Sequence, residues 1–259
     1  MAEEKKSVII VSHAMEIGGA ERALLGLLEA FDYEYYRVDL FLMRHEGELF
    51  AYLPEQVNLL PEIRQYTGLA VPFSSILKRR MFRVAAGRLT AKIKAHSFVK
   101  RHGLNPDNGV ELEYSHKYTL QAMPMISEKE YDLAISFLTP HYFAAKRVKA
   151  KKKAAWIHTD YSYVETDIAS ELKMWSAYDY IVSISDACRE GFLSRFPKLT
   201  EKIVDMENIL HPDLIKRQAE ETDVSAEMPD EEGIIRLLSV GRFSAQKNFD
   251  SIPEICRSR

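Results

Sequence analysis

Two glycines near the N-terminus have the residue type and position of a loop that could bind a phosphate. Gly18 and Gly19 follow the apolar run Val8 to Val11 and precede a segment with helical periodicity. Because they have no side chains, backbone N–H groups and the N-terminus of the next helix could approach a phosphate or a sugar hydroxyl. The spacing is not that of a GxGxxG loop, and an ordinary tight turn between a strand and a helix also favours glycine. Both interpretations stay open.

A second loop, near the C-terminus, holds two cations. Arg242 and Lys247 follow the apolar segment Ile234 to Val240. Two cations at the end of a strand can converge on a diphosphate, whose charge grows as it departs as a leaving group. Solvated loop cations are the alternative, but the Val-Gly-Arg-Phe sequence that contains Arg242 favours the diphosphate role.

His158 ends a third apolar run, which begins at Ala154. Open α/β sheets bind ligands at the carboxyl ends of their strands, so this position suits a ligand contact, although a lone histidine can also be purely structural. Cys188 and Cys256 are far apart and lack ligand spacing, so we expect neither a metal site nor a disulfide framework.

Alternating strands and helices from residue 7 to residue 212 predict a Rossmann-like, doubly wound parallel sheet of the α/β class. Ser185 and Asp186 stand where a helix N-cap is expected, and we interpret them as structural support. The strands are expected at Val8–Val11, Arg37–Met43, Val57–Leu60, Tyr131–Phe137, Ala154–His158, Tyr178–Ser185 and Lys202–Leu210.

After this domain, assigned to residues 1–212, the chain changes character. Residues 213–233 are acidic and poor in large apolar side chains, which predicts a linker. Residues 234–259 predict one strand and the start of a helix, too little to bury a core. We therefore expect a stub of a second Rossmann-like domain.

A long helical stretch from Pro72 to His102 is strongly basic, with no acidic residue between Glu62 and Asp107. Apolar residues recur in it at every fourth position, from Leu77 to Ile93. Such a helix could lie on an anionic membrane, or it could be a solvated face around a packing stripe. Nucleic acid is disfavoured, because few aromatic residues are interleaved. The expected membrane-facing cations are Lys78, Arg79, Arg80, Arg83, Arg88 and Lys92.

Five segments in this order resemble the family 4 glycosyltransferases of the two-domain GT-B fold, from the first strand to the end of the chain. They are Gly18 to Arg22, Trp156 to His158, Ser183 to Asp186, Asn208 to Pro212 and Gly241 to Lys247. The resemblance implies retaining transfer of a sugar from a nucleotide diphosphate donor to a lipid-linked or polysaccharide acceptor in cell-envelope synthesis. It implies neither a metal nor another cofactor.

The resemblance also implies roles for individual residues. His158 would be the catalytic contact to the donor sugar near the reacting carbon. Arg242, Lys247 and Gly19 would bind the donor diphosphate, and Gly18 would belong to the acceptor loop. Asn208 and His211 with Pro212 match the interdomain crossover. Asp160 receives no catalytic role, because the leaving phosphate is thought to act as the base.

One feature of the family pattern is absent. No Glu-x7-Glu segment, which holds the ribose and sugar of the donor in this family, follows Lys247. We therefore expect a chain that is inactive alone, as a truncated gene, a fragment, or one half of a split enzyme with a separate C-terminal half. A non-catalytic module that binds an acceptor or a membrane is the alternative function, and an epimerase fits the motif order less well.

The composition of the chain indicates where in the cell the protein is expected. Lys and Arg number 35 against 38 Asp and Glu, so charged partners must be recognised by local clusters. No run approaches about 20 uninterrupted apolar residues, and no signal peptide is recognisable. We expect a cytoplasmic protein, with a peripheral location on the inner face of the cell membrane left open by the basic stretch.

Overall fold

The computed structural model describes residues 5–105, 108–138, 141–227, 229, 232–233, 235–241 and 248–257. The chain divides into two compact units, Met1–Pro212 and Asp213–Arg259. Each is described by itself below.

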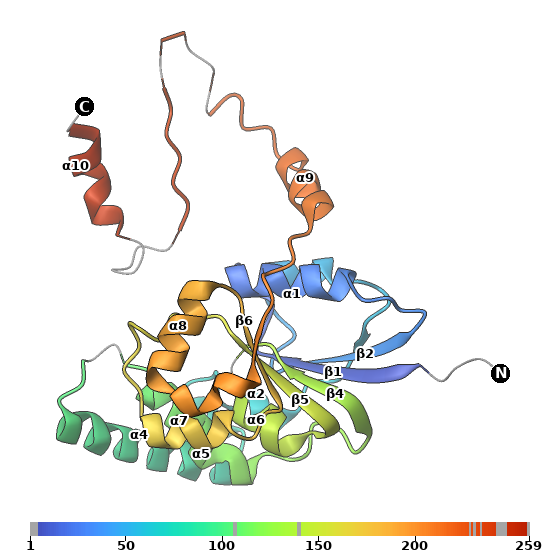
Figure 1. Ribbon diagram of the computed structural model, residues 1–259, viewed down its shortest axis with the longest axis vertical. Coiled ribbons are helices and arrows are strands. Elements are labelled where there is room, and N and C mark those ends of the chain that lie inside the picture. Colours follow the sequence, from blue (N-terminus) through green and yellow to red (C-terminus); the bar gives the residue numbers. More distant parts are fainter. Residues whose placement is uncertain are drawn as a thin grey trace. The chain divides into compact units, whose positions relative to one another are not determined.

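Within the described residues of the first unit, seven parallel strands form one sheet in the order β3-β2-β1-β4-β5-β6-β7. Helices cover both faces, with α1 on one side and α4 to α7 on the other (Figure 1). The prediction of a doubly wound α/β domain with a parallel sheet is thereby confirmed. The strands are β1 (Lys6–Ser12), β2 (Tyr36–Leu42), β3 (Asn58–Leu59), β4 (Glu130–Ser136), β5 (Lys149–Ile157), β6 (Tyr180–Ser183) and β7 (Ile203–Asp205).

Burial on both faces explains why the central strands are almost continuously apolar. Val8 to Val11 of β1 are at most 2% exposed, as a strand sandwiched between helices must be. The last two strands are shorter than the sequence suggested, because the chain turns away from the sheet after Ser183 and again after Asp205.

The helices are α1 (Gly19–Glu29), α2 (Arg64–Thr67), α3 (Phe73–Lys78), α4 (Phe82–His102), α5 (Val110–Thr119), α6 (His141–Arg147), α7 (Ile168–Trp175) and α8 (Asp186–Arg195). One core cluster joins β1, β2, α4 and α6 through Ile9, Phe41, Val84 and Phe143. Another joins β5, α7 and α8 through Ile157, Trp175 and Phe192. Together they fix the helices that surround the carboxyl end of β5.

The strand order reverses direction between β1 and β4. These two strands pair in register, with Val8 opposite Leu133 and Val11 opposite Ser136. The chain winds outward from β1 through β2 to β3, and in the other direction from β4 to β7. In open α/β sheets a ligand crevice forms beyond the carboxyl ends of the strands at such a reversal.

The sequence suggested one long helix for the basic stretch, but the structure divides it into two helices, α3 and α4. Helix α3 ends at Lys78, and Arg80 adopts a positive φ of 54°, which turns the chain before α4 begins. Helix α4 ends at His102, and the following Gly103 has a φ of 64°, the left-handed conformation of a glycine that terminates a helix.

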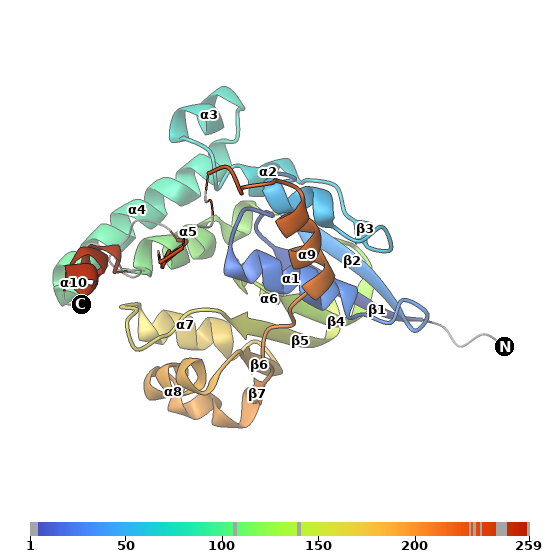
Figure 2. The ribbon, with the colours of Figure 1, turned by 90° about the horizontal axis from the view of Figure 1, so that it is seen from above.

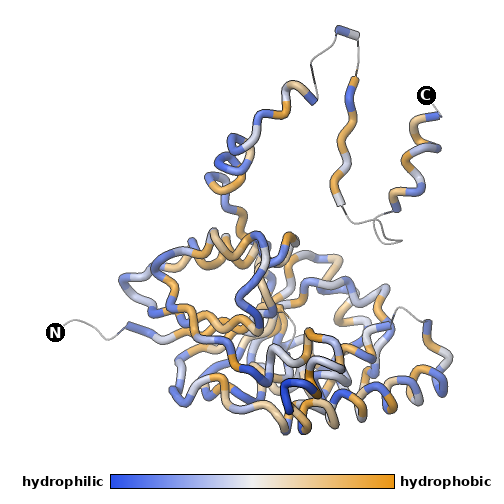
Figure 3. Tube along the Cα trace, turned by 180° about the vertical axis from the view of Figure 1, so that it is seen from behind, coloured by the Kyte–Doolittle hydropathy of each residue, from blue (hydrophilic) through white to orange (hydrophobic). Residues whose placement is uncertain are grey.

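The buried stripe of α4 also differs from the expected one. Leu89 and Ile93 are 52% and 60% exposed, whereas small residues face the protein. The cause is the close approach of α5, which lies alongside α4 (Figure 2): a Cβ on Gly87 would stand only 2.8 Å from the carbonyl oxygen of Tyr118. Large side chains therefore point outward, and blue and orange alternate along α4 in Figure 3.

The second unit contains helices but, in its described part, no strand. Helix α9 (Pro212–Glu220) begins the segment that we expected to be a linker, and α10 (Ile252–Arg257) lies near the C-terminus. The prediction of a strand from residue 234 is wrong for residues 235–240, which are irregular. Ile235 and Val240 are 88% and 86% exposed. An apolar segment becomes a strand only where a partner satisfies its backbone N–H and C=O groups.

Among the residues described, no helix combines the length and the apolar character needed to cross a membrane.

Candidate functional site

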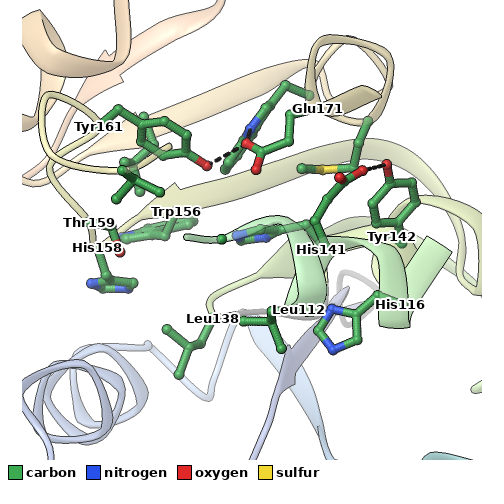
Figure 4. A pocket seen from close by; sticks show the side chains of 16 residues that line it. Leu112, His116, Leu138, His141, Tyr142, Trp156, His158, Thr159, Tyr161 and Glu171 are labelled. Atoms are coloured by element: carbon green, nitrogen blue, oxygen red, sulfur yellow. Dashed lines mark hydrogen bonds between the residues drawn. The ribbon is translucent and has the colours of Figure 1, made fainter. Parts of the chain in front are cut away.

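A cavity of about 150 Å³ lies beside the carboxyl end of β5 (Figure 4). Its walls come from α5, α6, α7 and the loop that follows β5. The site therefore lies at the sheet edge where ligands of parallel α/β domains bind, one strand away from the reversal between β1 and β4.

His158 lines this cavity, directly after β5. Its Nε2 is buried and has no hydrogen-bond partner within the described part of the chain. Burial lowers the pKa of His158 to about 4, against a smaller opposing effect of the Phe137 backbone, so the ring is neutral near pH 7. A neutral imidazole whose Nε2 has no partner can donate a hydrogen bond to a bound ligand or accept one from it, depending on the tautomer.

Glu171 of α7 lies on another wall, where Figure 4 shows it pointing toward Tyr161. The Tyr161 hydroxyl donates to Glu171 Oε2 over 2.8 Å, and Trp175 Nε1 donates to the same oxygen over 3.2 Å. Glu171 is 6% exposed, and burial raises its pKa to about 7 despite these donors.

Glu113 of α5 is the second buried carboxylate of the cavity, at 7% exposure. Its Oε1 accepts hydrogen bonds from the Tyr142 hydroxyl at 2.6 Å and from Ser170 Oγ at 2.5 Å. Its Oε2 is buried without a partner among the residues described. Burial raises the pKa of Glu113, and the two hydroxyl donors oppose that rise.

Two more histidines complete the polar lining. His116 of α5 is 5% exposed, and burial lowers its pKa to about 3. His141, at the start of α6, has its Nδ1 2.8 Å from Ser136 Oγ, and burial lowers its pKa to about 3 as well. At neutral pH, these two rings and that of His158 are therefore uncharged.

The sequence did not single out Glu113, His116, His141 or Glu171. They come from three different helices, and Glu113 and Ser170, which share a hydrogen bond, are 57 residues apart. No short spacing connects them. The available signal was weak, namely a carboxylate and a histidine three residues apart on α5, both on a face that packs inward.

The glycine loop lies elsewhere on the same sheet edge. Gly18 is the N-cap of α1 with an extended backbone, and a Cβ there would stand 2.1 Å from Glu21 Oε2. A Cβ on Gly19 would meet nothing within 4 Å. Neither glycine lines the cavity. Because β4 lies between β1 and β5, this loop and His158 follow strands that are two positions apart in the sheet.

Arg242 and Lys247 lie outside the described residues. Lys78, Arg79, Arg80, Arg83 and Lys92 are exposed, as a membrane-facing role requires. Arg88 differs from them: it is half-buried, and its Nη1 donates to the carbonyl oxygens of Gly68 at 3.0 Å and Val71 at 2.6 Å. These bonds connect α4 to the preceding loop.

Three other motif positions make local contacts. Ser185 Oγ accepts a hydrogen bond from the Cys188 N–H over 3.2 Å, so the N-cap interpretation is confirmed. Asp160 Oδ1 accepts from the Ser162 N–H at 2.8 Å, within its own turn. His211 Nε2 lies 3.4 Å from Glu29 Oε1 of α1.

The cavity as a whole combines aromatic walls with buried acceptors of hydrogen bonds. In the described part of its lining there are two carboxylates and three histidines but no Lys or Arg. Such a lining suits an uncharged ligand that donates hydrogen bonds and does not suit an anion. Comparison with protein-family models and with curated proteins gives no match to this chain.

Proposed function

We propose that residues 1–212 are the acceptor-side domain of a retaining, nucleotide-sugar-dependent glycosyltransferase of the GT-B type, related to family 4. The observation that supports this most is His158, a neutral histidine with an unpartnered Nε2, in a small cavity at the carboxyl end of a parallel strand. In this proposal His158 contacts the donor sugar, and the acceptor hydroxyl is held in the same cavity.

The proposed reaction replaces one bond to the anomeric carbon. The bond from that carbon to the diphosphate oxygen breaks, the acceptor oxygen bonds to the carbon on the same face, and the acceptor proton passes to the leaving phosphate. His158 stabilises the reacting sugar by a hydrogen bond, and Gly19 leaves room for the diphosphate at the N-terminus of α1. Arg242 and Lys247 neutralise the diphosphate.

We expect His158→Ala to lower the rate of sugar transfer by roughly 10²-fold or more, the usual cost of losing one preorganised contact to the reacting group. The assay uses a panel of uridine and guanosine diphosphate sugars with lipid-linked and glycan acceptors, with the chain alone and with a separately expressed C-terminal half. His96→Ala, on the exposed surface of α4, is the matched control. Equal rates in His158→Ala and wild type would refute the proposed role.

A second function, binding to an anionic membrane, is supported by the outer surface of α3 and α4. Large apolar side chains stand exposed there among the cations. Phe82 and Ile93 are 63% and 60% exposed, and Phe73, Leu77 and Leu89 are between 41% and 52% exposed. Apolar side chains can enter the interface of a bilayer while neighbouring cations attract its anionic lipids.

We expect the protein to co-sediment with vesicles of phosphatidylglycerol and phosphatidylcholine at low ionic strength, and to be released by salt. The triple change Arg79→Glu, Arg80→Glu and Arg83→Glu should weaken binding about 10²-fold, since each cation contributes about 1 kcal/mol near an anionic surface. Lys146→Glu, Lys173→Glu and Lys198→Glu together alter the net charge equally on other exposed positions. Equal loss in both triple variants would show that net charge, and not this surface, governs binding.

A further inference from the structure

Glu113 Oε2, an atom of a residue that lines the cavity, has no hydrogen-bond donor among the described residues. A buried carboxylate oxygen without a hydrogen-bond donor is costly, and such atoms are rare in folded proteins. The other oxygen of the same carboxylate already accepts from Tyr142 and Ser170, which hold the group in place. The donor that Oε2 lacks is therefore one that a ligand in the cavity would bring.

Size and charge narrow the choice of ligand. A cavity of about 150 Å³ has the volume of an engineered protein cavity known to hold a benzene molecule, so it takes the ring atoms of one six-membered ring. The cavity is not enclosed, so the outer substituents of a larger pyranose can extend out of it. Glu113 and Glu171 line it, and no Lys or Arg of the described chain does. Lys117, the cation that acts on Glu113, donates to Ser170 Oγ and is not part of the lining, so the site disfavours anionic rings.

The walls favour a saccharide among uncharged rings. Trp156 and Trp175 both line the cavity, together with Tyr142 and Tyr161. The two tyrosine hydroxyls are engaged by Glu113 and Glu171, which fixes the orientation of their rings. Aromatic surface next to a few fixed polar groups suits a pyranose, which has apolar C–H faces and a rim of hydroxyls.

We infer that this cavity binds one uncharged pyranose ring, the ring of the acceptor that receives the transferred sugar, with a ring hydroxyl donating to Glu113 Oε2. The inference rests on the proposed function and names its acceptor chemistry. Glu113 is thus a residue that determines acceptor specificity.

Tryptophan fluorescence of the whole chain tests the inference directly. The protein has two tryptophans, and both line the cavity, so a change in intrinsic fluorescence reports on this site. The probes are methyl glucopyranoside, methyl galactopyranoside, methyl mannopyranoside and N-acetylglucosamine, with glucuronate as the anionic probe and glucosamine as the cationic one. We expect a saturable change with at least one neutral glycoside and none with glucuronate.

Glu113→Gln should weaken that binding at least tenfold, because the change replaces one carboxylate oxygen by an NH2 group, which cannot accept a hydrogen bond. Glu111→Gln, two residues away on the exposed face of α5, should leave it unchanged. Thermal unfolding shows whether each variant is folded. If Glu113→Gln does not fold, Leu112→Arg replaces it: Leu112 is 53% exposed at the cavity, and a guanidinium there should compete with the sugar for Glu113 and abolish binding.

The inference is overturned if no neutral glycoside changes the fluorescence at about 100 mM, if glucuronate or glucosamine alone binds, or if Glu113→Gln binds as the wild type does. These results differ from a failure of the proposed function. Glycoside binding that depends on Glu113, without transfer from any nucleotide sugar, would preserve the inference and reject glycosyl transfer. A rate of sugar transfer that is the same in Glu113→Gln as in the wild type would preserve glycosyl transfer and reject the role of Glu113 in acceptor binding.

Discussion

Lowering the pH from 7 to 4.5 is expected to remove several kcal/mol from the free energy of unfolding of the first unit. His116, His141 and His158 have pKa values lowered to about 3, 3 and 4, below the ordinary 6.5. The unfolded chain therefore takes up these protons first. Stability is fully present above pH 6.5 and falls as the pH drops, by about 1.4 kcal/mol per pH unit for each histidine.

Glu171 acts in the opposite direction. Its pKa in the folded protein is raised from 4.5 to about 7, so the folded chain holds a proton that the unfolded chain has lost between these values. Its contribution rises by about 3 kcal/mol as the pH falls through this window, against about 8 kcal/mol lost by the three histidines. The net loss, about 5 kcal/mol, is comparable with the whole stability of a marginally stable domain.

Urea unfolding at a series of pH values measures both effects. His116→Gln should reduce the dependence of stability on pH by about 1.4 kcal/mol per pH unit between pH 6.5 and 4.5, and Glu171→Gln should make the loss steeper. His96→Gln, on the exposed surface of α4, controls for the removal of any histidine. Parallel curves for wild type, His116→Gln and Glu171→Gln would contradict the assigned burial of these groups.

Replacing Gly26 by alanine is expected to lower the stability of the fold, whereas the same change at Gly19, also in α1, is not. Gly26 faces the segment that follows β7, and its Cβ would stand 2.0 Å from the carbonyl oxygen of Ile209 and 2.7 Å from the carbonyl carbon. Gly26→Ala should therefore destabilise the fold by about 1–3 kcal/mol, although alanine is the better helix former by about 1 kcal/mol. The backbone of Ile209 cannot move aside as a flexible side chain could.

Gly19→Ala is the matched variant at the start of the same helix. Nothing lies within 4 Å of the added Cβ, so stability should stay the same or rise by up to about 1 kcal/mol. If Gly19 admits a diphosphate, the same change should weaken nucleotide-sugar binding in calorimetry. A stable Gly26→Ala protein would show that the Ile209 segment yields; unchanged donor binding in Gly19→Ala would remove the loop from the donor site.

The sequence predicts those parts of the fold that depend on burial along a single element. Apolar runs such as Val8 to Val11 are sufficient to place the central strands, because a strand covered on both faces tolerates little else. Contacts between elements decided the rest. The predicted buried stripe of α4 was wrong at Leu89 and Ile93, because α5 approaches α4 closely at Gly87 and its small neighbours and the large side chains point outward.

The same distinction applies to the site. His158 could be found from its place after a strand, since strand ends share one edge of a parallel sheet. Glu113 and Glu171 could not, because each lies on a helix whose neighbours across the cavity are far away in the sequence. Their chemistry depends on burial and on the hydroxyls of Tyr142 and Tyr161, which only the packed domain brings within reach.

The lengths of the outer strands have a consequence for the behaviour of the protein in concentrated solution. β3 spans two residues and β7 three, whereas β1, β2, β4 and β5 span seven to nine. Unpaired backbone groups along a long sheet edge invite strand addition from another molecule, and short edge strands offer little of this template. The native sheet of this unit is thus protected against edge-to-edge aggregation. The long strands β1, β4 and β5 have a neighbouring strand on both sides, so their edges become available for strand addition only when a neighbour detaches.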